Sequence, residues 1–250
     1  MAGHSKWANI KHRKGRQDAK RSKIWSRCSR AVIVAAKAGG PDPDMNLTLR
    51  YAIDDAKAEN MPKDTITNAI KKGTGELQGV NYEQISYEGY GPNGVAVILD
   101  ILTDNRNRTA PLVKRVFERC GGKMGTNGCV SYIFHAKGQI TVDATNVEEE
   151  TIIELALEAG AEDIQREADT WLITTGFADL YQVKESLEAK DLTITSAQQT
   201  MVPDNTVPCE GRDAEKIFKM LEAFDDLEDV QKIHANYEIT DEEMQRVADL

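Results

Sequence analysis

The first forty residues carry the side chains whose types and spacing most clearly indicate a chemistry. They hold eleven Lys or Arg residues against one acidic residue, Asp18, a formal charge of +10, whereas the whole chain of 250 residues carries −10. The other 210 residues therefore carry −20. Because charges more than about 8 Å apart hardly interact across water at physiological salt, an acidic body does not cancel a basic segment that projects from it. Such a segment is suited to contacts with phosphate groups.

Between positions 16 and 38 the residues recur with the period of an amphipathic helix. At about 100° per residue, most of the basic residues share one arc, and apolar residues such as Trp25 share another, so one face is basic and the other can be buried. Arg21 departs from this pattern, because it falls on the apolar side. Gly39 and Pro41 predict the end of the helix, since glycine supplies a left-handed cap and proline cannot continue a helix.

Two other interpretations compete with a nucleic-acid-binding role for this basic segment. A solvated charged helix face is one, but the near absence of acidic residues leaves the cations without partners within the helix. An organellar transit peptide is the other, but the capped helix leads directly into further structured segments. We therefore favour a nucleic-acid contact surface. The predicted nucleic-acid-binding residues are Lys6, Trp7, Lys11, His12, Arg13, Lys14, Arg16, Lys20, Lys23, Arg27 and Arg30.

A second polar cluster lies at residues 104–109, between an apolar strand and a predicted helix. As structure, it supplies turn and N-cap residues. As function, it offers Arg106 and Arg108 to a phosphate or to the acidic surface of a partner. The residues alone leave both interpretations open.

The opening residues 1–14, MAGHSKWANIKHRK, resemble the YebC/PmpR family, which includes mitochondrial translational activators. The resemblance covers essentially the whole chain. It implies a three-domain arrangement, favours a contact role for Arg106 and Arg108, and supports either transcriptional regulation by DNA binding or a translation factor acting on the ribosome. The further segments that carry it are 17–21, 36–44, 60–64, 87–92, 104–109 and 121–122.

The order of periodic segments predicts an α+β protein. Three N-terminal helices, the second and third at 45–59 and 63–72, are expected to form a basic helical domain over residues 1–75, with the third helix ending at Gly73. Two α/β domains follow: a discontinuous one at 76–134 with 205–240, and one inserted at 135–204. In the inserted domain the order βαββαβ is the ferredoxin-like signature. The expected elements are strands at 85–88, 95–102, 130–134, 139–142, 163–167, 171–174, 193–197 and 230–235, helices at 108–119, 148–159, 178–188 and 213–224, and a peripheral tail at 241–250.

The remaining motifs do not indicate a catalytic, cofactor or metal site. The G-x-G-x-x-G pattern at residues 89–94 precedes a strand rather than a helix, so it predicts a hairpin turn and not a dinucleotide site. The four cysteines form no Cys-x-x-Cys pair and are expected to be free thiols in a reducing cytosol. Paired carboxylates such as Asp225 with Asp226 are interpreted as solvated helix faces. We therefore expect no enzymatic activity, no cofactor and no small-molecule substrate.

The apolar runs are too short to span a bilayer, and no signal-peptide core follows the N-terminus, so a cytoplasmic protein without membrane contact is expected. The resulting hypothesis is a non-enzymatic nucleic-acid-binding regulator of gene expression, first as a DNA-binding transcriptional regulator. The alternative is a ribosome-associated RNA-binding translation factor, because Trp7 could stack on an exposed base, although it could equally pack beside Ile10. A protein-interaction scaffold is the third hypothesis, under which the basic side chains would affect only solubility.

Overall fold

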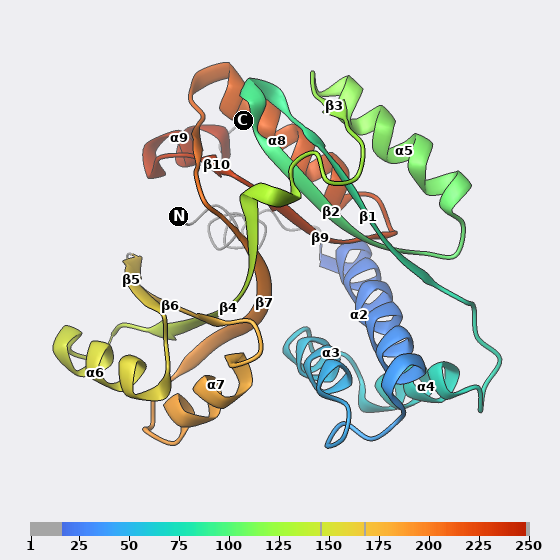
Figure 1. Cartoon of the computed structure of the whole chain (residues 1–250). Helices are drawn as coiled ribbons and strands as arrows, with labels where there is room; N and C mark the ends of the chain where they lie inside the picture. The colour runs from blue at the N-terminus through green and yellow to red at the C-terminus, as the bar shows by residue number, and fades with distance from the viewer. Residues whose placement is uncertain (1–16, 146, 168, 249–250) are drawn as a thin grey trace. The chain divides into compact units, whose positions relative to one another are not determined.

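The computed structural model describes residues 17–145, 147–167 and 169–248, which divide into two compact units (Figure 1). One unit contains the described residues up to 131 and from 206 onward, and the other is formed by Tyr132–Asn205. None of the helices in these described ranges combines the length and the apolar character that crossing a membrane requires.

The first unit begins with three helices, α2 (Gln17–Gly39), α3 (Leu47–Ala58) and α4 (Lys63–Thr74). Their shared core is built largely from small side chains, which let the helices approach closely. Asn46 caps α3 by accepting a hydrogen bond from the N–H of Leu49 at 3.1 Å, and its amide also donates to the carbonyl of Ala35 at 2.8 Å. One side chain therefore joins the beginning of α3 to the end of α2. The core residues are Val32, Ile33, Ala35, Ala36, Leu49, Ala52 and Ala69.

The end of α4 lies two residues beyond the predicted one. Gly75, with a φ of 84°, supplies the left-handed cap, whereas Gly73 lies inside the helix. A Cβ atom at Gly73 would lie 2.5 Å from the carbonyl oxygen of Ile33 on α2. This glycine is therefore explained by the close contact between α2 and α4 rather than by the end of a helix.

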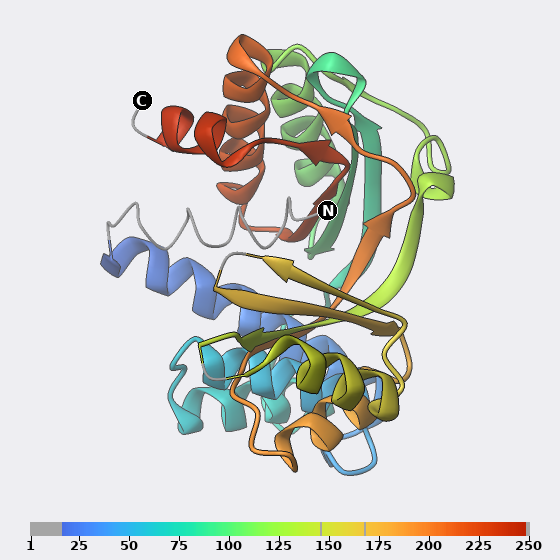
Figure 2. The same ribbon diagram turned by 90° about the vertical axis from the view of Figure 1, so that its left-hand side faces the viewer.

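The same unit contains a four-stranded sheet in the order β3-β1-β2-β9, in which all neighbours are antiparallel. Its helices α5 and α8 pack side by side on one face of the sheet (Figure 2), where Phe117 and Phe224 meet edge to face with ring centroids 4.8 Å apart. The turn at residues 89–94 closes the β1–β2 hairpin, as predicted, and contains the short helix η1 (Pro92–Gly94). The bounds are β1 (Glu83–Tyr90), β2 (Ala96–Thr103), α5 (Arg106–Arg119), β3 (Lys123–Met124), α8 (Gly211–Asp225) and β9 (Val230–Ala235).

The segment expected to be a peripheral tail contains a helix. Residues 241–248 form α9 (Asp241–Ala248), preceded by β10 (Tyr237–Glu238), which pairs with β8 (Val207–Pro208) in parallel. The guanidinium of Arg246 donates to Glu215 on α8 at 2.8 Å and to the carbonyl of Gly211 at 2.8 Å. Neither contact could be inferred from the local charge pattern.

The second unit has the predicted βαββαβ order, and its sheet has the strand order β5-β6-β4-β7 with all neighbours antiparallel. Buried aliphatic side chains, among them Ile140, Ile152, Ile173 and Leu187, form its core. The ferredoxin-like expectation and the α+β fold class, with three N-terminal helices and one α/β layer inserted in another, are confirmed. The bounds are β4 (Phe134–Asp143), α6 (Glu149–Ala159), β5 (Asp163–Glu167), β6 (Thr170–Gly176), α7 (Leu180–Glu188) and β7 (Ile194–Pro203). The exact boundaries 1–75, 76–134 with 205–240, and 135–204 stay a prediction.

The predicted strand at 130–134 is wrong. Its place is taken by a turn containing the short helix η2 (Ser131–Ile133), and the strand predicted at 139–142 is the middle of the ten-residue β4. The carboxylate of Glu88, 5% exposed, holds the preceding loop by accepting hydrogen bonds from the N–H groups of Gly128, Val130 and Ser131 at 2.8–3.0 Å. Burial disfavours the charged form of Glu88, but these hydrogen bonds outweigh it and lower the pKa.

Candidate nucleic-acid interface

The structure describes only part of the predicted nucleic-acid-binding set. Lys20 lies in the first turn of α2, but its side chain is outside the described part of the chain, whereas the side chains of Lys23, Arg27 and Arg30 are described. The predicted residues that lie wholly outside the described ranges are Lys6, Trp7, Lys11, His12, Arg13, Lys14 and Arg16.

Lys23, Arg27 and Arg30 of α2 meet the carboxylates of residues 225–229, a segment at the end of α8 called here the acidic turn. The ammonium of Lys23 lies 3.0 Å from Asp226, and the guanidinium of Arg27 lies 2.7 Å from the carboxylate of Asp225 and also donates to its backbone carbonyl. Arg30 lies 2.9 Å from Asp229. Within this unit, the charges of these cations are therefore compensated by acidic residues about 200 positions away in the sequence.

No local pattern in the sequence predicts this pairing. The sequence pattern predicts a solvated helix face for Asp225 and Asp226, and the near absence of acidic residues within α2 predicts cations without partners. The charge balance of a helix reports only on partners that lie one turn away. Long-range partners depend on how α8 and β9 are placed, and no local signal predicts that.

Asp229 is the most connected carboxylate of the acidic turn. It accepts hydrogen bonds from the hydroxyls of Thr103 at 3.1 Å and Thr109 at 2.6 Å, and from the guanidinium of Arg108 at 2.9 Å. Burial disfavours its charge, but the hydrogen bonds from Thr109 and Arg108 outweigh burial and lower the pKa of Asp229. The carboxylate is thus held charged between the end of β2, the start of α5 and the cation of Arg30.

The cluster at 104–109 has the structural role that its sequence allowed. Asn105 caps α5 by accepting a hydrogen bond from the N–H of Arg108 at 3.1 Å. The side chain of Arg108 pairs with Asp104 at 2.7 Å and with Asp229, and these hydrogen bonds raise the pKa of the guanidinium. Arg106 is exposed on the first turn of α5. A contact of Arg106 or Arg108 with a phosphate or a partner stays a prediction.

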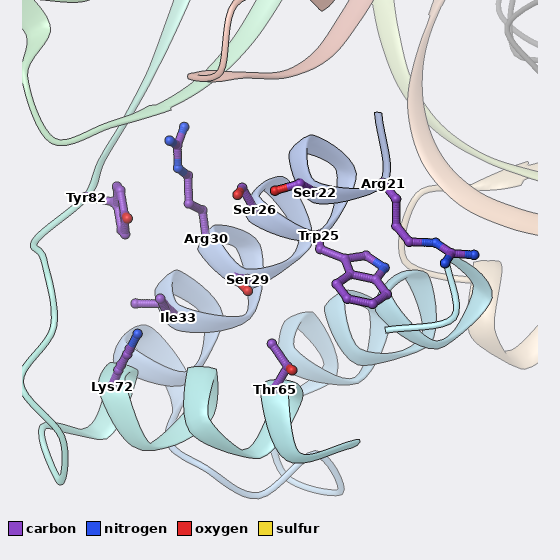
Figure 3. A pocket seen from close by; sticks show the side chains of 10 residues that line it. All are labelled: Arg21, Ser22, Trp25, Ser26, Ser29, Arg30, Ile33, Thr65, Lys72 and Tyr82. Carbon is purple, nitrogen blue, oxygen red and sulfur yellow. The ribbon is translucent and has the colours of Figure 1, made fainter. Parts of the chain in front are cut away.

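A pocket of about 500 Å³ opens between the N-terminal half of α2, helix α4 and Tyr82 (Figure 3). In Figure 3 three serines of α2 lie between the rings of Trp25 and Tyr82. The guanidinium carbon of Arg21 lies 5.9 Å from the ring centroid of Trp25, and that of Arg30 lies 5.6 Å from the ring centroid of Tyr82. The lining residues are Arg21, Ser22, Trp25, Ser26, Ser29, Arg30, Ile33, Thr65, Lys72 and Tyr82.

Sequence reasoning missed this pocket. The helical pattern predicts that Trp25 lies on the buried face, and Arg21 departs from that pattern. The available signal was the spacing of Ser22, Ser26 and Ser29, which puts three small polar side chains on one side of α2, between its basic and apolar arcs.

Comparison with known proteins covers almost the whole chain. Residues 5–76 match the family model described as the TACO1/YebC protein N-terminal domain, and residues 82–237 match the TACO1/YebC second and third domain. A protein of Natranaerobius thermophilus named "Probable transcriptional regulatory protein" is 50% identical over 248 residues, which cover 98% of this chain and 99% of the relative. A relative from Syntrophotalea carbinolica with the same name is 51% identical and covers 99% of each chain.

A solved structure is also similar. The crystal structure of a conserved hypothetical protein from Aquifex aeolicus superimposes with a TM-score of 0.81 at 48% identity, and the match covers 90% of this chain and 93% of that one. The resemblance suggested by the opening residues is thereby confirmed, and the chain belongs to the TACO1/YebC family.

Proposed function

We propose that this protein is a non-enzymatic, nucleic-acid-binding regulator of gene expression that acts in the cytoplasm, first as a DNA-binding regulator of transcription. The observation that carries the proposal is the concentration of eleven cations and one acidic residue in the first forty positions of an otherwise acidic chain. The naming of its relatives as probable transcriptional regulatory proteins supports the regulatory role.

The carboxylates of the acidic turn would compete with nucleic-acid phosphates for the cations of α2. Lys23 and Arg27 are paired with carboxylates, so a nucleic acid that uses them must replace Asp226 and Asp225 by phosphates. The cations that precede α2 in the sequence are then the first to engage, and those of α2 follow by exchange. Phosphate contacts of this kind position a protein on nucleic acid without reading its sequence.

A ribosome-associated RNA-binding translation factor is the second candidate. The pocket beside α2 favours it, because Trp25 and Tyr82 offer aromatic surface next to Arg21, Arg30 and Lys72. Structured RNA presents unpaired bases that stack on such side chains, whereas regular duplex DNA does not.

Salt-dependent binding tests the proposal. The intact protein is titrated with duplex DNA and with a structured RNA, and ribosome co-sedimentation is measured at low and high salt. If about six cations neutralise phosphates of duplex DNA, log K should fall against log salt with a slope of about −5. The test variant carries Gln at Lys6, Lys11, Arg13, Lys14, Lys20 and Lys23.

A matched variant controls for the change in net charge. It replaces six exposed lysines elsewhere with Gln: Lys63, Lys114, Lys123, Lys190, Lys216 and Lys219. We expect the test variant to lose most of its affinity and most of the salt slope, and the control to keep both. If the test variant bound nucleic acid as tightly as the parent, the proposal that the basic segment contacts nucleic acid would be refuted. Retention on ribosomes with only weak, sequence-blind DNA binding would select the translation factor over the transcriptional regulator.

A further inference from the structure

The pocket beside α2 is lined by hydroxyl, cationic and aromatic side chains. Ser22, Ser26 and Ser29 lie within about 60° of one another around the axis of α2, so their hydroxyls line one side of the hollow. Further along α2, Val32 and Ala36 instead belong to the packed core of the helical layer. The polar stretch therefore coincides with the part of α2 where the pocket opens.

Cationic side chains lie at both ends of this row of three serines. Figure 3 shows Arg21 beside Trp25 at one end, and Arg30 and Lys72 near Tyr82 at the other. Arg30 also contacts the acidic turn, but neither Arg21 nor Lys72 has a carboxylate partner among the described residues. The pocket is therefore lined by two cations that no carboxylate of the described residues compensates.

The two aromatic side chains differ in how firmly they are held. The indole N–H of Trp25 donates to the carbonyl of Glu59 at 3.0 Å, and its ring packs against the small cluster around Met61 and Ile66, so the tryptophan is part of the wall. Tyr82 precedes β1 and is only partly buried. Its ring packs against the edge of the helical core, so a substitution that keeps the ring, Tyr82→Phe, must accompany one that removes it.

Together these groups complement the parts of a nucleotide. Guanidinium and ammonium groups bind phosphate, aromatic rings and guanidinium planes stack on bases, and serine hydroxyls both donate and accept hydrogen bonds, as a sugar or a base edge requires. A volume of about 500 Å³ lies within the range of pockets that hold small ligands, about 300–1,000 Å³. A paired base in a duplex could not enter, since its faces and edge are already occupied.

We propose that this pocket receives one unpaired nucleotide of the nucleic acid that the basic segment binds. The inference rests on the proposed nucleic-acid-binding function and adds to it a preference for bulges and overhangs over perfect duplex. The shared chemistry is that of an unpaired nucleotide, whether it belongs to RNA or to DNA.

The test compares two hairpins with the same stem, one fully paired and one with a single-nucleotide bulge, each made in RNA and in DNA. Binding to the full-length protein is measured by fluorescence anisotropy at a fixed salt concentration. Because stacking of one base on an aromatic side chain changes affinity by about 5-fold to 150-fold, we expect the parent to bind the bulged hairpin at least about 5-fold more tightly. A preference in RNA alone would assign the nucleotide to RNA through its 2′-hydroxyl.

The variants Tyr82→Ala and Lys72→Gln should lose this preference, while Tyr82→Phe should keep it because the ring remains. The matched controls are Tyr132→Ala, which removes a tyrosine that is 70% exposed in the other unit, and Lys63→Gln, which removes an exposed lysine of the same helix α4. Thermal unfolding of each variant verifies that the protein is folded.

The outcomes separate this inference from the proposed function. Tight binding without any preference for the bulge would overturn the pocket assignment and leave the nucleic-acid function standing. A preference that survives in Tyr82→Ala would overturn it as well. If the variant with six cations of the basic segment changed to Gln bound as well as the parent, the proposed function would be refuted. Absence of binding to any of the hairpins would overturn both proposals.

Discussion

Removing the carboxylates that pair with α2 should strengthen nucleic-acid binding. In the free protein, Lys23 and Arg27 are engaged by Asp226 and Asp225 at 3.0 and 2.7 Å. A phosphate that uses these cations must first displace the carboxylates. The double substitution Asp225→Asn with Asp226→Asn removes that competition while keeping the size and the hydrogen-bonding oxygen of each side chain.

The expected gain in nucleic-acid affinity follows from the solvent exposure of the two ion pairs. The side chain of Asp226 is 85% exposed, so its pair with Lys23 is worth about 0.2–1 kcal/mol. The side chains of Arg27 and Asp225 are only 12% and 22% exposed, which places their pair at the upper end of that range or somewhat above it. Giving up both pairs therefore costs about 1–2 kcal/mol, which corresponds to about 5-fold to 30-fold in the dissociation constant.

The assay is fluorescence anisotropy with a duplex DNA and a structured RNA, repeated over a series of salt concentrations. If the parent exchanges the carboxylates for phosphates, the variant should bind more tightly with the same salt slope. If the parent leaves the two ion pairs intact in the complex, the variant gains up to two phosphate contacts, and the slope against log salt steepens by about 1.8.

A charge-matched control is needed, because removing any two negative charges strengthens binding to a polyanion. The double variant Glu149→Gln with Glu150→Gln changes two exposed carboxylates of α6 in the other unit. If the acidic-turn variant shows no more affinity than this control and has the same slope, Lys23 and Arg27 are not part of the nucleic-acid surface. In that case their ion pairs serve only to hold α2 against the acidic turn.

Two predictions concern the scaffold. Glu88→Gln should lower the free energy of unfolding by about 2–3 kcal/mol near neutral pH, because an amide cannot accept all three N–H groups of the loop at 128–131. The pKa of Glu88 in the folded protein lies below its ordinary value of 4.5. The difference in the free energy of unfolding between parent and variant should therefore be complete above pH 4.5 and shrink as the pH falls below that value. Urea unfolding at a series of pH values measures this difference. Gly73→Ala should destabilise the protein by about 1–3 kcal/mol, because its Cβ would lie 2.5 Å from the carbonyl oxygen of Ile33, whereas Asn68→Ala on the exposed side of α4 should be neutral or slightly stabilising in the same assay.

The elements of this fold were predictable where the local pattern decides them. The period of residues 16–38 predicted a helix that ends at Gly39, and the order of strands and helices predicted the ferredoxin-like unit. The secondary-structure predictions failed at residues whose type is compatible with two different structural roles. Gly73 looked like a helix end but provides a close helix contact, and Val130 looked like part of a strand but lies in a loop held by the carboxylate of Glu88.

The candidate site was predictable only in part, for a similar reason. The basic residues of α2 recur in consecutive turns of one helix, so the sequence alone predicted that they share one arc of the helix surface. Its partners at 225–229 and the pocket residue Tyr82 come from other segments, and only the packing of α2 within this unit brings them together. An N-cap within residues 104–109, in contrast, was predicted, because such a cap lies only three residues from the N–H that it binds; the structure assigns it to Asn105 and begins the helix at Arg106 rather than at 108.

Arg30 makes the two sides of α2 interdependent. Its guanidinium lies 2.9 Å from Asp229 on the basic side and 5.6 Å from the ring centroid of Tyr82 on the pocket side. The carboxylates of Asp225 and Asp226 pair with other cations, so removing them leaves the contact between Arg30 and Asp229 in place. The acidic-turn variant should therefore bind paired and bulged hairpins more tightly by the same factor, because only the phosphate exchange on the basic side has become easier. A change in the ratio of the two affinities would mean that the acidic turn also controls the pocket, and Arg30 is the side chain through which it would do so.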